Sequence, residues 1–150
     1  MLKVNFYDSV EDRLLKFAVI VSCYNHQWVF CKHKQRNTYE VPGGHREVRE
    51  DILTTAKREL FEETGAMEFD IKPICVYSVQ DLDGAMKNSE ETFGMLYFAD
   101  IRSFQKLPDF EIERIALFPD LPKELTYPQI QPQLVEKVKS VVFAGRTRER

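Results

Sequence analysis

The first third of the chain alternates short apolar runs with turn-forming residues, which is the pattern of β-strands. Residues 17–24 and 27–33 are rich in β-branched and aromatic side chains and are separated only by Asn25-His26, so they predict a hairpin. Residues 38–41 predict a third, short strand. The Pro-Gly-Gly sequence at 42–44 ends it, and the chain must turn there because glycine adopts backbone angles closed to other residues.

A different period begins at Asp51. From Asp51 to Thr64 apolar residues recur at spacings of three and four, at Leu53, Ala56 and Leu60. This spacing predicts a helix whose apolar face packs on the core, and Gly65 stands where a C-cap glycine belongs.

Three more strands and a second helix are predicted in the rest of the chain. The strands cover 68–80, 92–101 and 110–118, with Pro73 marking a bulge or an edge, and the polar stretch 81–91 is expected to cover or border a site. The helix covers 132–144, with Pro132 in its first turn, Gly145 at its end and an apolar face made of Leu134, Val135, Val138, Val141 and Val142.

Strands that surround two helices predict an α/β fold of the α+β kind, an α/β/α sandwich with a mixed sheet. The length of 150 residues suits one domain, which we expect over residues 1–145 with a frayed tail at 146–150. No apolar run approaches the roughly 20 residues of a membrane span, and the charged N-terminal residues do not fit an export signal. We therefore expect a cytoplasmic protein with no membrane partner.

Charge and cysteine content narrow the classes of ligand. A net charge of -3 argues against stable nucleic-acid binding, but phosphorylated small molecules can be held through divalent cations. Cys23, Cys31 and Cys75 are odd in number and lack metal-type spacing, so we expect buried free thiols.

The predicted helix 51–64 carries three acidic residues, Glu59, Glu62 and Glu63, at neighbouring points of one face. Such clustering destabilises a helix unless a cation offsets the repulsion, and Arg58, four residues before Glu62, offsets part of it. The remaining charge suits Mg²⁺, which binds carboxylates, water and substrate phosphates. On spacing alone, a solvated acidic face is the alternative.

The stretch GHREVREDILTTAKRELFEETGA resembles the signature of the Nudix family. Every specified position agrees: Gly44, five residues, Glu50, seven residues, Arg58-Glu59, the aliphatic Leu60, one residue, Glu62-Glu63, one residue, Gly65 and Ala66. Tyr39 to Gly44 also resembles the aromatic-x-apolar-Pro-Gly-Gly lead-in, so the specific resemblance covers residues 39–66, about one-fifth of the chain. Arg49 departs from the glycine of many members, and we expect it to affect loop shape only.

The resemblance implies a phosphohydrolase that cleaves a diphosphate linkage in a nucleotide and needs Mg²⁺, with Mn²⁺ as a substitute. In the family, three helix glutamates and the carbonyl of the first box glycine bind the metal, which here implicates Glu59, Glu62, Glu63 and Gly44. The metal neutralises the diphosphate and lowers the pKa of the attacking water. Arg58 and Glu50 look like supporting residues that hold the carboxylates in place.

The resemblance leaves the general base open, because family members draw it from different places. Glu59 is one candidate. The others lie in loops after the box, namely Glu111, Glu113, Glu90 and Glu91, of which we favour Glu111. For each loop glutamate, a solvated surface carboxylate is the alternative.

Family members of this size suggest a nucleoside triphosphate pyrophosphohydrolase, such as one acting on 8-oxo-dGTP, as the leading hypothesis. ADP-ribose, dinucleoside polyphosphates and capped RNA ends are the alternatives, because the box contacts the diphosphate rather than the attached group. A non-catalytic nucleotide-sensing domain is the rival from another class, and it predicts lost carboxylates. Both a monomer and a homodimer fit the sequence.

Overall fold

The computed structural model describes residues 2–82 and 90–143. Within them the chain forms one sheet of eight strands in the order β1-β6-β7-β2-β3-β4, with β5 paired to β2 and β8 to β3. The strands are β1 (Leu2–Tyr7), β2 (Leu15–Tyr24), β3 (Gln27–His33), β4 (Tyr39–Glu40), β5 (Gly43–His45), β6 (Ala66–Asp81), β7 (Thr92–Phe104) and β8 (Ile112–Phe118). The helical segments are the short 3-10 turn η1 (Asp12–Leu14), α1 (Ile52–Thr64) and α2 (Gln131–Val142).

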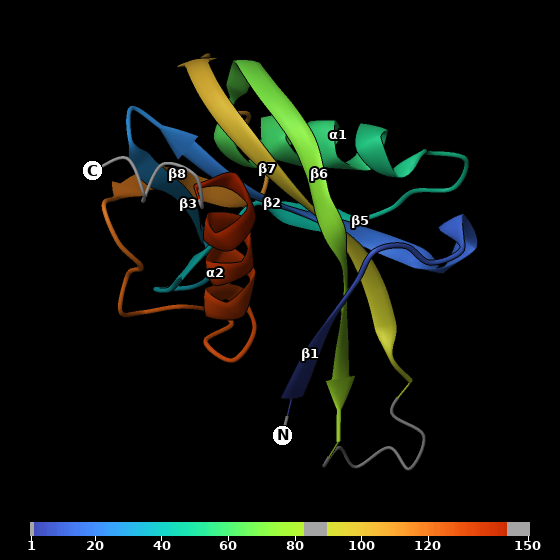
Figure 1. Cartoon of the computed structure of the whole chain (residues 1–150). Helices are drawn as coiled ribbons and strands as arrows, with labels where there is room; N and C mark the ends of the chain where they lie inside the picture. The colour runs from blue at the N-terminus through green and yellow to red at the C-terminus, as the bar shows by residue number, and fades with distance from the viewer. Residues whose placement is uncertain (1, 83–89, 144–150) are drawn as a thin grey trace.

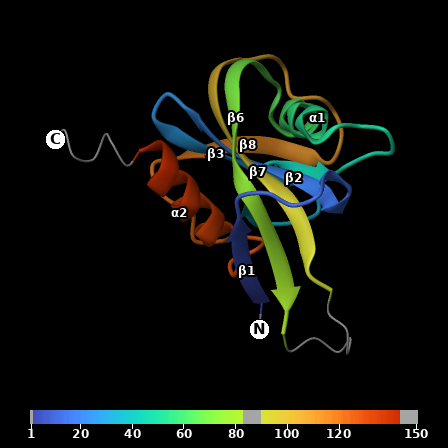
Figure 2. The same cartoon turned by 45° about the vertical axis from the view of Figure 1, so that its right-hand side comes forward.

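The sheet is mixed because its central pair runs parallel while the other pairs run antiparallel. Strands β2 and β7 pair in parallel with Ala18 opposite Met95. Helix α1 lies on one face of the sheet and α2 on the other, as Figures 1 and 2 show from two directions. The predicted α/β/α sandwich with a mixed sheet is therefore confirmed.

Each helix packs on one face of the sheet and forms an apolar core with it. Ala56 and Leu60 of α1 are fully buried against one face of the sheet, among Ile20, Val29 and Tyr97. On the other face, Leu134, Val135 and Val138 of α2 pack with Val21, Phe30 and Leu96. Burial of this kind stabilises the fold by roughly 1.5–3 kcal/mol for each large aliphatic side chain, and it fixes which face α1 presents to solvent.

The local signals read from the sequence correspond to defined backbone geometry. Asn25 and His26 take positive φ angles of 51° and 66° in the predicted β2–β3 hairpin. Asp51 caps α1 by accepting a hydrogen bond from the Thr54 N–H at 2.8 Å, and Gly65 ends it in the left-handed conformation. The β6–β7 register shifts between Pro73 and Cys75, so the predicted bulge is confirmed.

Several expectations about single positions are wrong. Leu53 is 39% exposed, because α1 begins at Ile52 and its buried stripe runs through Ile52, Ala56 and Leu60 at a spacing of four. Val141, in the last turn of α2, is 49% exposed. Residues 43–44 do more than turn the chain, since Gly43 opens β5 and pairs with Val19 of β2.

The structure adds one strand to those predicted and agrees with the expected burial of the cysteines only in part. Strand β1 was not predicted, and it pairs along β6 from Leu2 opposite Asp81 to Tyr7 opposite Val76. All three cysteines are free, but only Cys31 is fully buried. Residues 83–89 of the predicted polar stretch and the predicted end and tail of the chain, 144–150, lie outside the described residues. Among the helices that are described, none is long and apolar enough to cross a membrane.

Candidate active site

Two consecutive glycines bring the backbone of β5 against its neighbours. A Cβ atom on Gly43 would lie 2.7 Å from the Ala18 carbonyl oxygen, and one on Gly44 would lie 2.3 Å from the carboxylate carbon of Glu59. Neither distance is available to a real side chain. At Gly43 the obstacle is the backbone of β2, whereas at Gly44 it is the Glu59 side chain of α1, which would have to move. The β5 backbone therefore lies directly against the Glu59 carboxylate.

Glu63 is held by the same backbone through a hydrogen bond. The Gly43 N–H donates to Glu63 Oε1 at 2.8 Å. Burial is the main cause that raises the pKa of Glu63 to about 8; the negative charges of Glu59, Glu40 and Glu111 add to the rise, and the Gly43 hydrogen bond opposes it. A carboxylate in these surroundings is stabilised in its ionised form by any cation that enters.

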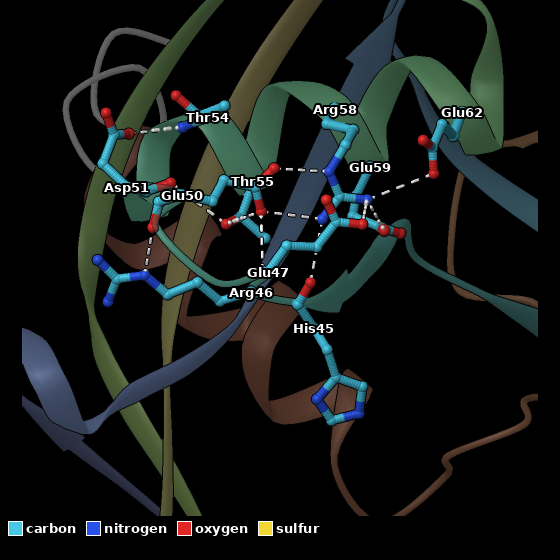
Figure 3. Close-up of polar contacts among 10 residues, drawn as sticks. All are labelled: His45, Arg46, Glu47, Glu50, Asp51, Thr54, Thr55, Arg58, Glu59 and Glu62. Atoms are coloured by element: carbon cyan, nitrogen blue, oxygen red, sulfur yellow. Dashed lines mark hydrogen bonds and ion pairs between the residues drawn. The ribbon is translucent and has the colours of Figure 1, made fainter.

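Arg58 is the centre of the polar network on α1 (Figure 3). Its Nε and Nη2 donate to the two oxygens of Glu50 at 2.7 and 3.0 Å, the two-point geometry that arginine makes with a carboxylate. Its Nη1 donates to Glu59 at 2.7 Å and to Glu62 at 3.4 Å, and Nη2 also reaches the His45 carbonyl oxygen at 3.1 Å. These contacts place Arg58 between Glu50 and the carboxylates of Glu59 and Glu62; a supporting role for Arg58 and Glu50 stays a prediction.

Glu50 has a full set of hydrogen-bond donors. Besides Arg58, the Thr55 hydroxyl donates to Oε1 at 2.7 Å and the Glu47 N–H at 3.1 Å. The Arg58 hydrogen bond is the largest of the causes that lower the pKa of Glu50 to about 2. Glu50 is therefore ionised at neutral pH and holds Arg58 in place, which leaves only one guanidinium nitrogen for Glu59 and Glu62.

A second arginine, which the sequence did not single out, fixes the loop before α1. Arg46 donates to the Glu50 carbonyl oxygen at 2.6 Å, to the Asp12 carbonyl at 2.9 Å and to the Asp12 carboxylate at 2.8 Å. Figure 3 shows Arg46 extended beneath Asp51 and Glu50. The loop is thus tied to η1, 34 residues earlier in the chain, and no local sequence signal reports that pairing.

The residues present fit a divalent cation, although their carboxylates are turned to other partners. Over residues 2–82 and 90–143, no three acidic, histidine or cysteine side chains converge in a geometry that could hold a metal ion. Glu59 and Glu62 instead face Arg58, and Glu63 faces Gly43. The donor set is all oxygen, as Mg²⁺ prefers, and burial raises the pKa of Glu59 as it does that of Glu63. A cation held by Glu59 and Glu62 would therefore have to draw both carboxylates from Arg58.

The structure separates the candidate general bases. Glu111 precedes β8, and its negative charge is one of the smaller causes that raise the pKa values of Glu59 and Glu63. Glu113 pairs with Lys32 at 3.2 Å. Glu91 accepts hydrogen bonds from Asn5, Tyr7 and Ser78 on β1 and β6. Glu90 is exposed.

Comparison with known proteins agrees with this geometry. The family model of the NUDIX domain matches residues 14–144. The chain is 30% identical over 126 residues to a Bacillus subtilis (strain 168) protein named "Putative 8-oxo-dGTP diphosphatase YtkD", covering 83% of this chain and 75% of that protein. It is similar to the crystal structure of the Bacillus subtilis pyrophosphohydrolase BsRppH, with a TM-score of 0.75 and 25% identity over 95% of this chain and 92% of the other.

A MutT NUDIX hydrolase from Burkholderia pseudomallei shares the fold, with a TM-score of 0.60 and 22% identity over 81% of this chain and 95% of that one. The family model covers most of the chain and includes every residue of the site described above except Asp12. This chain belongs to the Nudix hydrolase family.

Proposed function

We propose that this protein is a magnesium-dependent pyrophosphohydrolase that converts nucleoside triphosphates, with oxidised purine nucleotides such as 8-oxo-dGTP as the leading candidates, to a monophosphate and pyrophosphate. The observation that carries the proposal is the pairing of Glu59 and Glu63 with the glycine backbone of β5. Two partly buried carboxylates with raised pKa values, which lie against Gly43 and Gly44, favour a cation between protein and phosphates.

In this proposal the site residues have two roles, holding the metal and supporting the residues that hold it. Glu59, Glu62, Glu63 and the Gly44 carbonyl oxygen would hold the metal. When bound, the metal supplies charge neutralisation of the diphosphate and a water of lowered pKa. Arg58 and Glu50 keep the helix carboxylates in register with β5 through the two-point pair described above.

Glu111 is the residue we propose as general base. Its carboxylate accepts a proton from water as the oxygen of that water bonds to phosphorus and the bridging phosphorus–oxygen bond breaks, so that pyrophosphate leaves with the bridging electrons. Two observations support this role. The Glu111 side chain is 78% exposed and so accessible to water, and its negative charge contributes to the raised pKa values of Glu59 and Glu63. Replacing Glu111 by Gln is expected to lower kcat by about 100-fold or more.

The substrate class rests on names of similar proteins together with the site. The Bacillus subtilis relative is named for 8-oxo-dGTP and the similar crystal structure for pyrophosphohydrolase activity. Both names agree with release of pyrophosphate. The site itself favours any ligand that offers two linked phosphates to a cation, so the attached nucleoside must be found by assay.

The test is a panel assay of canonical triphosphates, 8-oxo-dGTP, ADP-ribose and dinucleoside polyphosphates with Mg²⁺, in which pyrophosphate and monophosphate are measured. We expect a triphosphate to give both products and Glu63→Gln to reduce turnover by orders of magnitude. Glu136→Gln, an exposed glutamate on α2, is the matched control and should behave as wild type. Preference for ADP-ribose or a dinucleoside polyphosphate would overturn the substrate class, and absence of hydrolysis across the panel would overturn the function.

A further inference from the structure

A histidine at the end of β3 lies beside the carboxylate of Glu111. His33 Nε2 is 3.5 Å from Glu111 Oε2. The histidine side chain is 19% exposed, whereas that of the glutamate is 78% exposed. The ring is therefore fixed by the fold, and the carboxylate that faces it is not.

The backbone determines which nitrogen of the His33 ring carries the proton. The Gln35 N–H donates to His33 Nδ1 at 3.2 Å. Because Nδ1 accepts a hydrogen bond, it has no proton in the neutral ring, and the proton must sit on Nε2. The ring therefore presents an N–H donor to Glu111, which as a carboxylate is an acceptor only.

Lys34, the residue after His33, holds the backbone of Glu111 and the side chain of Asp109. The Lys34 N–H donates to the Glu111 carbonyl oxygen at 2.9 Å, and Lys34 Nζ lies 2.6 Å from Asp109 Oδ1. The backbone of Glu111 is thus anchored, while its side chain retains the rotational freedom of an exposed glutamate. His33 is the neighbour placed to restrict that freedom.

Such restriction matters for a general base, since proton transfer requires the base within hydrogen-bond reach of the reacting water. A flexible carboxylate spends only part of its time there, and ordering a glutamate side chain costs conformational entropy. A donor at a fixed position on β3 reduces that cost before substrate binds. At 3.5 Å the His33–Glu111 contact is longer than an ordinary hydrogen bond, and catalytic contacts of this kind are often long in the free enzyme and tighten in the complex.

We propose that His33 is a positioning residue for the reaction: its Nε2–H holds the Glu111 carboxylate in the orientation from which Glu111 accepts the proton of the attacking water. The inference rests on the proposed function, because it assumes that Glu111 is the base. His33 does not contact substrate in this account and acts only through Glu111.

Three single variants test the proposal. His33→Asn removes the Nε2 donor and is expected to lower kcat by about 10-fold with KM unchanged, the size of effect seen when a residue that orients a functional group is lost. His33→Gln places an amide N–H near the former Nε2 and should recover most of kcat. His26→Asn is the matched control, because His26 lies at the far end of β3, roughly 20 Å away at the rise of a strand, and should leave kcat unchanged.

A double variant asks whether His33 acts through Glu111. In a Glu111→Gln background, His33→Asn should cause no further loss of kcat. An equal further loss there, wild-type kcat in His33→Asn, or failure of His33→Gln to recover activity would each overturn the proposal.

A measurement without turnover separates this inference from the proposed function. Long-range ¹H–¹⁵N NMR of the metal-free protein at pH 8 reports which ring nitrogen of His33 carries the proton. We expect the Nε2–H form, with a shift of that signal in Glu111→Gln. If wild type hydrolyses nothing in the panel, the proposed function fails, and the NMR result alone decides the contact: an Nδ1–H form, or no response to Glu111→Gln, overturns it.

Discussion

Replacing Gly44 by alanine tests whether the close fit of β5 against α1 serves the site. The added Cβ would lie 2.4 and 2.6 Å from the two carboxylate oxygens of Glu59, whereas real Cβ atoms rarely approach other atoms within 3.4 Å. The φ angle of Gly44 is not in the left-handed region, so alanine fits the backbone and the conflict is with Glu59 alone. The carboxylate must retreat by about 0.6–1 Å.

The cost to the fold is small and the cost to the reaction is large. The obstacle is the flexible end of the Glu59 side chain, so its hydrogen bond with Arg58 at 2.7 Å can lengthen without being lost; full loss of that bond would set the upper limit, at about 1.5–3 kcal/mol. A displacement of about 1 Å of a group that positions the reactants costs about 100-fold in rate.

The assay combines steady-state hydrolysis with Mg²⁺ titration by calorimetry and thermal unfolding. We expect Gly44→Ala to unfold cooperatively near the wild-type temperature but to lose about 100-fold in kcat and to bind Mg²⁺ more weakly. Gly43→Ala is the matched comparison, because its Cβ would meet the Ala18 carbonyl oxygen in the sheet and should lower stability as well. Wild-type kcat and Mg²⁺ affinity in Gly44→Ala would refute the reasoning.

Three further predictions follow from the same network. Glu50→Gln leaves the guanidinium of Arg58 without its two-point partner and should lower the free energy of unfolding by about 2–4 kcal/mol in urea denaturation. Glu47→Gln is the control, because the Glu47 side chain is 68% exposed, and it should leave the free energy of unfolding unchanged. Equal stability of the two variants would contradict this. Mg²⁺ affinity should rise as pH increases toward 8, because Glu63 must lose its proton to bind a cation and burial raises its pKa to about 8. Calorimetry at pH 6 and pH 8 measures the affinity, and equal values would exclude that role for Glu63. The metal-free protein should lose stability as pH rises from 4.5 to about 8, with Glu63 contributing at most about 5 kcal/mol, because the folded state binds the Glu63 proton more tightly than the unfolded state. Glu63→Gln should reduce that dependence in denaturation curves, leaving the smaller part due to Glu59, and an unchanged slope would contradict the assignment.

The sequence predicted those parts of the site whose residues are close along the chain. Glu50, Arg58 and Glu59 lie on one loop and one helix, so spacing alone places them together, and Gly65 marks the helix end by its conformation. The apolar period of α1 also placed the acidic residues away from its buried stripe, although the stripe begins at Ile52 rather than Leu53.

The remaining contacts join residues that are distant in sequence. Asp12 and Arg46 are 34 residues apart, and His33 and Glu111 meet because β3 pairs with β8. Strand β1 was not predicted because its alternating apolar pattern is short and its partner strand, β6, follows more than 60 residues later in the chain. Such pairings depend on tertiary packing, which local propensity does not encode.

If the α1 glutamates bind a divalent cation beside the β5 backbone, anomalous diffraction from crystals grown with saturating Mn²⁺ will locate it. We expect a peak within about 2.0–2.3 Å of carboxylate oxygens of Glu59, Glu62 or Glu63 and near the Gly44 carbonyl oxygen, with Glu59 drawn away from Arg58. A map without a peak there, with Glu59 still bonded to Arg58, would contradict this expectation.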